Sequence, residues 1–337
     1  MLDRTFFTSS FEKSCIFGGG MWHSSVPMRA GVVGAPLARS GCMFGMGAGA
    51  THIVDERELA YYLRPATPEV ALSFTPTQPK MGEPVALALT FTENGKPLGE
   101  MSVSHDRLIH TIIIPQDFSG FSHIHVEDSA QVSDAMRASG VYPLQFTFPT
   151  PGKYLVAVDF AVRAERHHKR FVVEVAGGAP STTYTHDSAM IKDFGEYTVT
   201  LNSESAGTVP AHMHGGDTSA HADYNINLKY HIAKKGFDVI DLEPYLSAPM
   251  HIAVVSEDQS VFVHEHGMLP PSTIDTLVSR GKSLVGIPEN HGMHMTEIPS
   301  RFGPDVTATI SLPKAGTYHV FGEFMRKGER TVTHFVI

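Results

Sequence analysis

From Leu72 onward the chain alternates apolar and polar residues in short runs, and glycine, proline and asparagine separate these runs. A period of two is typical of β-strands, because successive side chains of a strand point to opposite faces. Many short strands with turn residues between them indicate a β-sandwich. The predicted strands span 84–92, 110–115, 121–126, 144–148, 154–162, 170–175, 197–202, 224–232, 251–255, 261–264, 307–312, 318–324 and 331–337.

The strand pattern stops at residues 176–180, Ala-Gly-Gly-Ala-Pro, and then restarts, which predicts a domain boundary. We expect an all-β fold of two tandem β-sandwiches, at 68–177 and at 178–337, the second with helical and loop insertions. Short helices are expected at 55–63, 129–138 and 273–283. Residues 1–67 form the remaining segment, which we expect to be a targeting segment or an extended arm on a protein partner.

An internal repeat relates the two predicted sandwiches. The sequence Pro-Gly-Lys-Tyr at 151–154 matches Ala-Gly-Thr-Tyr at 315–318, and a duplication with one insertion explains the offsets. The same repeat carries the histidine pattern H-x12-H-x-H in each copy. Its members are His110, His123 and His125 in the first copy, and His251, His264 and His266 in the second.

The spacing of these histidines predicts that they converge. Residues i and i+2 of a strand share a face, so the last two histidines of each pattern point the same way. A hairpin turning at 116–117 would set His110 opposite His123, and one turning at 257–258 would set His251 opposite His264. Three imidazoles on one hairpin can then bind one ion at about 2.0–2.1 Å.

The repeat also supplies a carboxylate. Asp159 and Glu323 occupy equivalent positions on the penultimate strand of each copy, where burial costs free energy unless the group is paired or binds a metal. Two sites of three histidines and one carboxylate are therefore predicted. They are His110, His123 and His125 with Asp159, and His251, His264 and His266 with Glu323. The alternative is that duplication copied structural histidines, with the acids as hydrogen-bond partners.

The chain contains 20 histidines and 15 methionines, so other sites must be weighed. His105 lies near the first hairpin, but Leu246 is its repeat equivalent, so we expect a neighbour of the site. His167 and His168 are expected in an exposed turn. The remaining candidates belong to an accessory Met/His copper site or to solvated loops; they are His212, Met213, His214, His221, His291, Met293 and His294.

Composition narrows the function classes. Apolar residues make up 42% and charged residues 18%, as in a globular protein, and the net charge of −9 argues against a nucleic-acid partner. No apolar run reaches the roughly 18 residues of a membrane span. Only Cys15 and Cys42 are present, which excludes a disulfide framework and a blue-copper site in the main body.

The stretch 108–125, with Pro-Lys-Met-Gly-Glu-Pro at 79–84 before it, resembles poorly characterised bacterial periplasmic or secreted proteins. The resemblance covers about 77–175 and, more weakly, 225–337. It implies immunoglobulin-type or cupredoxin-like sandwiches associated with metal handling. Val126 and Gly267 stand where that family has proline, and no clear secretory signal is present, so organelle import is an alternative location.

From these observations we expect divalent transition-metal binding, trafficking or storage, with Cu, Zn or Fe as the ion, and binding is favoured over enzymatic activity. Imidazole-rich ligation with one carboxylate disfavours Ca and Mg. A metal-dependent oxidoreductase is the first alternative, and it would need an open coordination position. The second is a structural subunit of a larger assembly, with vestigial sites.

Overall fold

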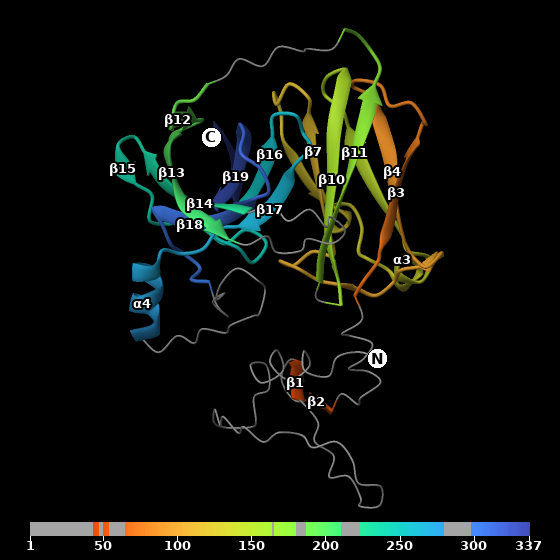
Figure 1. Cartoon of the computed structure of the whole chain (residues 1–337), viewed down its shortest axis with the longest axis horizontal. Coiled ribbons are helices and arrows are strands. Elements are labelled where there is room, and N and C mark those ends of the chain that lie inside the picture. The colour runs from red at the N-terminus through yellow and green to blue at the C-terminus, as the bar shows by residue number, and fades with distance from the viewer. Residues whose placement is uncertain are drawn as a thin grey trace, which may run out of the picture. The chain divides into compact units, whose positions relative to one another are not determined.

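The computed structural model describes residues 43–46, 50–53, 65–163, 165–179, 187–209, 223–279 and 298–337. Their regular secondary structure is almost entirely β-strand, so the predicted all-β fold class is confirmed (Figure 1). The chain divides into two units, Met1–Pro65 and Ala66–Ile337. The first unit contains a hairpin of β1 (Met43–Met46) and β2 (Ala50–Ile53). The helix predicted at 55–63 lies outside the described residues, as does most of the predicted arm.

The first sandwich encloses a core of aliphatic and aromatic side chains, among them Leu87, Phe91 and Val156. Alternation along β4 explains this packing, because every second residue of that strand is buried. The outer sheet contains β3 (Glu69–Thr75), β4 (Pro84–Glu93), β5 (Lys96–Pro97) and β9 (Val141–Thr147). The inner sheet contains β6 (Met101–Ser102), β7 (Ile109–Pro115), β8 (Ser122–His125), β10 (Gly152–Val162) and β11 (Glu165–Val175).

The second sandwich has the same plan and a core of its own, which includes Leu201, Tyr230 and Val254. The outer sheet contains β12 (Ile191–Phe194), β13 (Tyr197–Val209), β14 (Asp223–Lys234), β15 (Phe237–Asp238) and β18 (Asp305–Leu312). The inner sheet contains β16 (His251–Ser256), β17 (Phe262–His266), β19 (Tyr318–Arg326) and β20 (Glu329–Val336).

The repeat is visible in the hydrogen bonds as well as in the strands. The Tyr154 hydroxyl donates to the Thr150 carbonyl at 2.9 Å, and the Tyr318 hydroxyl donates to the Lys314 carbonyl at 2.7 Å. Both tyrosines lie near the start of the central strand of an inner sheet. The two inner sheets are therefore equivalent parts of a duplicated fold.

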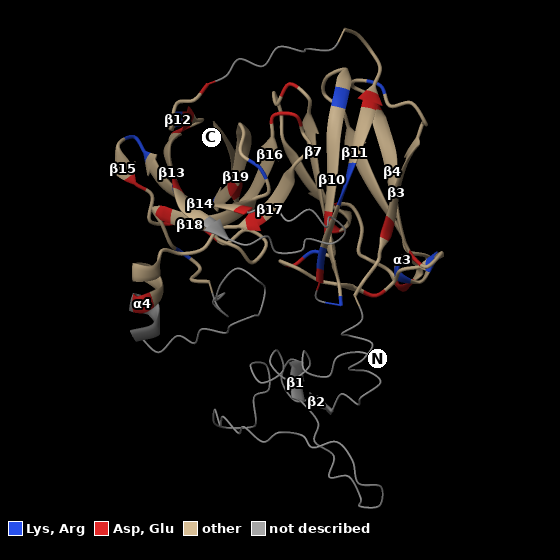
Figure 2. Cartoon of the chain, viewed as in Figure 1, with Lys and Arg blue, Asp and Glu red and all other residues tan. Residues whose placement is uncertain are grey.

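The central strands of the two inner sheets, β7, β10, β16 and β19, are buried on both faces, because the sandwiches pack against each other through these sheets. All seven residues of β7 are buried, and Figure 2 shows no charged residue on this strand. Ile113 enters the core of its own sandwich, whereas Ile112 and Ile114 enter a third core between the sandwiches. On the other side of that third core lie Ala253 and Val255 of β16. A strand buried on both faces is continuously apolar, which explains the uninterrupted run at 112–114.

Helices are few, and one prediction about them is wrong. Helix α3 (Asp134–Ser139) begins later than predicted, because the Ser133 side chain caps it by accepting from the Met136 amide. Gly140 ends the helix with φ of 67°, a conformation that favours glycine. Residues 126–128 form only a 3-10 turn, η1 (Val126–Asp128). Helix α4 (Pro271–Ser279) overlaps the predicted 273–283, of which 280–283 lie outside the described residues.

Seven of the described strands were not predicted: β1, β2, β3 and β12, and the two-residue strands β5, β6 and β15. His167 and His168 lie within β11 rather than in a turn. In the part of the chain that the structure describes, no helix is long and apolar enough to cross a membrane.

Candidate metal centre

The first histidine triad lies on the hairpin of β7 and β8. His110 pairs with His125, and Ile112 pairs with His123, so the predicted pairing of His110 with His123 is wrong by two residues. The strands pair only as far as Ile113 and Ser122, and the wide turn beyond them shifts the register. A shift of two residues keeps every side chain on its face, so the three histidines still converge.

The three ring nitrogens of this triad form a nearly equilateral triangle. His110 Nδ1 lies 3.0 Å from His123 Nε2 and 3.2 Å from His125 Nε2, and the latter two atoms are 3.0 Å apart. Three nitrogens bound to one tetrahedral ion at about 2.0–2.1 Å would be about 3.3–3.4 Å apart. The triangle therefore needs only a slight expansion to hold such an ion.

The second triad repeats this arrangement on β16 and β17. His251 pairs with His266 rather than with His264, which corrects the second predicted pairing in the same way. His251 Nδ1 lies 3.3 Å from His264 Nε2. The ring of His266 lies 4.6 Å from that of His251, centre to centre. The buried Nε2 atom of His266 has no hydrogen-bond partner among the described residues, so this nitrogen is available to bind an ion.

Hydrogen bonds to backbone carbonyls fix which ring nitrogen of His110 and of His251 faces the other histidines of its triad. His110 Nε2 lies 3.0 Å from the Ser104 carbonyl oxygen, and His251 Nε2 lies 3.1 Å from the Tyr245 carbonyl oxygen. A carbonyl only accepts, so each Nε2 carries the proton and each Nδ1 has a lone pair. This is how proteins orient metal-binding histidines.

The carboxylates act across the interface between the sandwiches. Asp159 and Glu323 lie opposite His110 and His251 in the strand register, as expected for equivalent residues. However, Asp159 Oδ2 accepts a hydrogen bond at 2.8 Å from Nδ1 of His264, which belongs to the other sandwich. Glu323 Oε2 reciprocally accepts from His123 Nδ1 at 2.5 Å. Each acid lies on the face of its strand that packs against the other sandwich, so its carboxylate contacts the histidine hairpin of that sandwich.

Two arginines hold these carboxylates, and sequence reasoning missed both. Arg166 Nη2 donates to Asp159 at 3.2 Å and to the His264 carbonyl at 2.7 Å. Arg330 Nη1 donates to Glu323 at 2.8 Å and to the His123 carbonyl at 3.3 Å. Each arginine follows its acid by 7 residues, and this repeated spacing is the signal that could have revealed them.

The electrostatics of the centre follow from burial. Burial raises the pKa of Glu323 to about 7, despite Arg330. Burial also acts to raise the pKa of Asp159, but Arg166 and the hydrogen bond from His264 outweigh it and hold that pKa well below its usual range. Burial, reinforced by neighbouring imidazoles, lowers the pKa of five centre histidines and keeps them neutral, as metal ligation requires. These are His110, His123, His125, His251 and His266.

The two triads form one cluster. One ring nitrogen from each of His110, His123, His251 and His264 lies within 4.8 Å of the others, so these buried residues can hold a metal ion. His125 flanks this group on the first hairpin. His105 stacks on the ring of His266 at 3.4 Å between centres and is a neighbour of the cluster. The cluster sits between β7 and β16, which face each other where the sandwiches meet (Figure 1).

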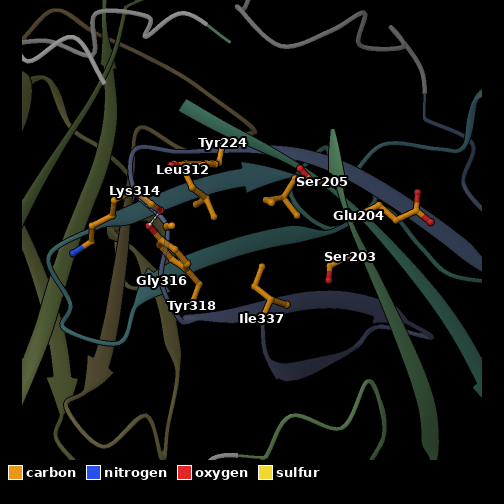
Figure 3. Close-up of a pocket in the computed structure, with 11 residues that line it drawn as sticks. Ser203, Glu204, Ser205, Tyr224, Leu312, Lys314, Gly316, Tyr318 and Ile337 are labelled. Carbon is orange, nitrogen blue, oxygen red and sulfur yellow. Dashed lines mark hydrogen bonds between the residues drawn. The ribbon is translucent and has the colours of Figure 1, made fainter. Parts of the chain in front are cut away.

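Other candidate sites are weaker. A pocket of about 290 Å³ opens in the second sandwich, where Figure 3 shows Tyr224, Leu312 and Tyr318 on its walls. Its one cationic lining residue, Lys314, is paired with Asp258 at 2.7 Å and is not available to a ligand. The proposed accessory copper residues lie outside the described residues; they are His212, Met213, His214, His221, His291, Met293 and His294.

A family described as a domain of unknown function, DUF8832, matches in two parts, at residues 66–177 and 194–337. The chain belongs to the DUF8832 family. The match in two parts corresponds to tandem domains, in agreement with the repeated sandwiches, and the DUF8832 description gives no activity.

No curated protein matches this DUF8832 chain. Among solved structures, it is similar to a crystal structure of a mutant Salmonella alpha-2-macroglobulin, with 12% sequence identity and a TM-score of 0.20. The match covers 81% of this chain and 16% of that one, so this chain spans a small part of that protein. A TM-score this low carries no inference about fold or function.

Proposed function

We propose that this DUF8832 chain binds transition-metal ions at the interface between its sandwiches, one ion in each histidine triad, for trafficking or storage. The observation that carries the proposal is the convergence of His110 Nδ1, His123 Nε2 and His125 Nε2 at 3.0–3.2 Å. The outer nitrogens of these rings face acceptors, so their inner lone pairs face one another. A single bound ion can be coordinated by all three lone pairs.

The donor set favours Cu, Zn or Fe. Neutral imidazoles suit these ions, whereas Ca and Mg prefer oxygen ligands. We assign Asp159 and Glu323 as hydrogen-bond acceptors that orient His264 and His123, rather than as metal ligands. Each carboxylate is already engaged by an arginine and an imidazole, which is the usual environment of a group that supports a ligand.

Metal analysis of the full-length chain tests this proposal. Purified protein loaded with Zn should hold two ions per chain, and His125→Ala or His266→Ala should each reduce this to one. The matched control is His231→Ala, which removes a histidine of the second outer sheet that pairs with Asp305 away from the triads. A metal content that is unchanged by both triad substitutions would contradict the proposal.

One observation favours a metal-dependent oxidoreductase as the second candidate. Each triad supplies three nitrogens, and a tetrahedral ion bound by three protein ligands keeps a fourth position for water or substrate. Turnover of a redox substrate about the size of water, such as dioxygen, by the Cu- or Fe-loaded chain, lost in His125→Ala, would support this candidate. A periplasmic or secreted location stays a prediction from the sequence resemblance alone.

A further inference from the structure

The two triads lie too close together to act as independent sites. One ring nitrogen each of His110 and His123 lies within 4.8 Å of one ring nitrogen each of His251 and His264. An ion lies about 2.0–2.1 Å from its nitrogen ligands. Two ions held by these pairs therefore face each other across a gap that one small ligand can span. In the two-metal sites of other proteins, ions about 3.5–4 Å apart stabilise oxygen atoms between them.

The ligand set supplies no negative charge to offset the repulsion between the two ions. The six triad imidazoles are neutral when they bind a metal. Three carboxylates accept from triad histidines, and each lies within 4.0 Å of an arginine: Asp159 of Arg166, Glu323 of Arg330 and Asp128 of Arg107. Two divalent ions would thus place four positive charges in a buried site without an anion among their ligands. Such a charge is unfavourable in a low-dielectric interior unless an anion enters with the ions.

The site admits only a small anion. The six triad histidines are at most 5% exposed. The third core, with Ile112, Ala253 and Phe321, closes the interface beside them. The fourth coordination position of each ion is then available to water, hydroxide or a ligand of similar size, and it is closed to a larger substrate.

We propose that the two triads form one dinuclear centre, whose ions share a single small bridging anion that is hydroxide at rest. A water molecule that enters between the ions loses one proton to solvent, and the remaining hydroxide binds both ions. Bound divalent ions lower the pKa of water enough for this step near neutral pH. The hydroxide is exchangeable for another small anion, such as azide. This inference rests on the proposed function, because it requires both triads to bind.

Copper provides the test, because a single-atom bridge couples the electron spins of two Cu(II) ions. The full-length chain is loaded with Cu(II), and the spin count from electron paramagnetic resonance is compared with total bound copper. The expected result is loss of most of the signal although two coppers are bound. Azide should then change the visible absorption of the loaded protein by replacing the hydroxide. Two bound coppers with a full spin count would overturn the bridge and leave metal binding intact.

A mixed-metal sample keeps the test independent of mutations that might unfold the chain. Protein loaded with one Cu(II) and one Zn(II) should regain the full spin count of its copper, because zinc has no unpaired electron. The single-triad variants His125→Ala and His266→Ala should also show full signals from their one copper. One copper per wild-type chain would overturn the dinuclear centre. No bound copper, with no bound zinc, would instead refute the proposed function itself.

Discussion

At the scale of single residues, the position of one proton decides what each imidazole can do. The Nδ1–H of His123 is directed to Glu323, and that of His264 is directed to Asp159. Each Nε2 lone pair then faces the triad. The acid that sets this arrangement belongs to the opposite sandwich, so the two halves of the chain control each other's ligands.

This crossed arrangement predicts which site each acid supports. In a His266→Ala background, where only the first triad can bind, Glu323→Ala should weaken zinc binding about 10–100-fold. The same substitution in a His125→Ala background should leave the second triad's affinity nearly unchanged, because Asp159 orients His264 there. Titration calorimetry measures both affinities. An equal loss of zinc affinity in both backgrounds would mean that Glu323 supports the stability of the whole fold rather than the orientation of His123.

A second prediction at this scale concerns pH. Burial lowers the pKa of five centre histidines below 6.5, the ordinary pKa of histidine, so these groups bind more protons in the unfolded chain than in the folded chain below that pH. Stability without metal should therefore fall as the pH drops below 6.5, because the five histidines together outweigh Glu323, whose raised pKa acts in the opposite direction through a single proton. Each histidine that stays neutral contributes up to about 1.4 kcal/mol per pH unit.

Urea unfolding of metal-free protein at about pH 8 and about pH 5.5 measures this effect. A His110→Gln, His251→Gln variant should lose less stability between the two pH values, because it lacks two of the titrating groups. A denaturation midpoint that is independent of pH in the wild type would contradict neutral, buried imidazoles.

At the scale of elements, β7 shows why the centre forms at the interface. Its odd-numbered residues, such as Ile113, face the core of their own sandwich, and its even-numbered residues face the other sandwich. His110 shares the even-numbered face with Ile112. The strand that builds the hydrophobic contact between the sandwiches thus also places the first metal ligand there.

Substitution of two neighbouring isoleucines of β7 distinguishes packing within the first sandwich from packing between the two sandwiches. Ile112→Ala and Ile113→Ala should each destabilise the chain by about 2–5 kcal/mol, because both side chains are fully buried. Only Ile112→Ala should also lower zinc affinity, since it loosens the packing between the two inner sheets. Urea unfolding and zinc titration of the two variants provide the comparison. Equal effects on zinc affinity would contradict a centre that depends on sandwich packing.

At the scale of the whole molecule, the sequence predicted the parts of the centre better than their assembly. The period-two pattern and the repeated histidine spacing led to two sandwiches, two hairpins and the convergence of each triad. Turn length could not be read from the pattern, so the pairing of His110 was predicted two residues away from His125. The packing of one sandwich on the other depends on long-range contacts, so neither the crossed acids nor the single cluster could be foreseen.

Packing of the inner sheets also gives the cluster its burial. Neither inner sheet alone would cover His110 or His251, because both residues lie on the face that the other sandwich covers. A buried centre of this kind ties metal binding to the docking of the two repeats. Ions bound there stabilise the docked state over any state in which the sandwiches separate.

The most direct test of the central claim is an anomalous-scattering map from crystals of the full-length chain loaded with zinc. We predict two peaks between β7 and β16, one bound by His110 Nδ1 with the Nε2 atoms of His123 and His125. The other should be bound by the equivalent atoms of His251, His264 and His266. Zinc peaks only outside these triads, with the inner nitrogens unligated, would contradict the account.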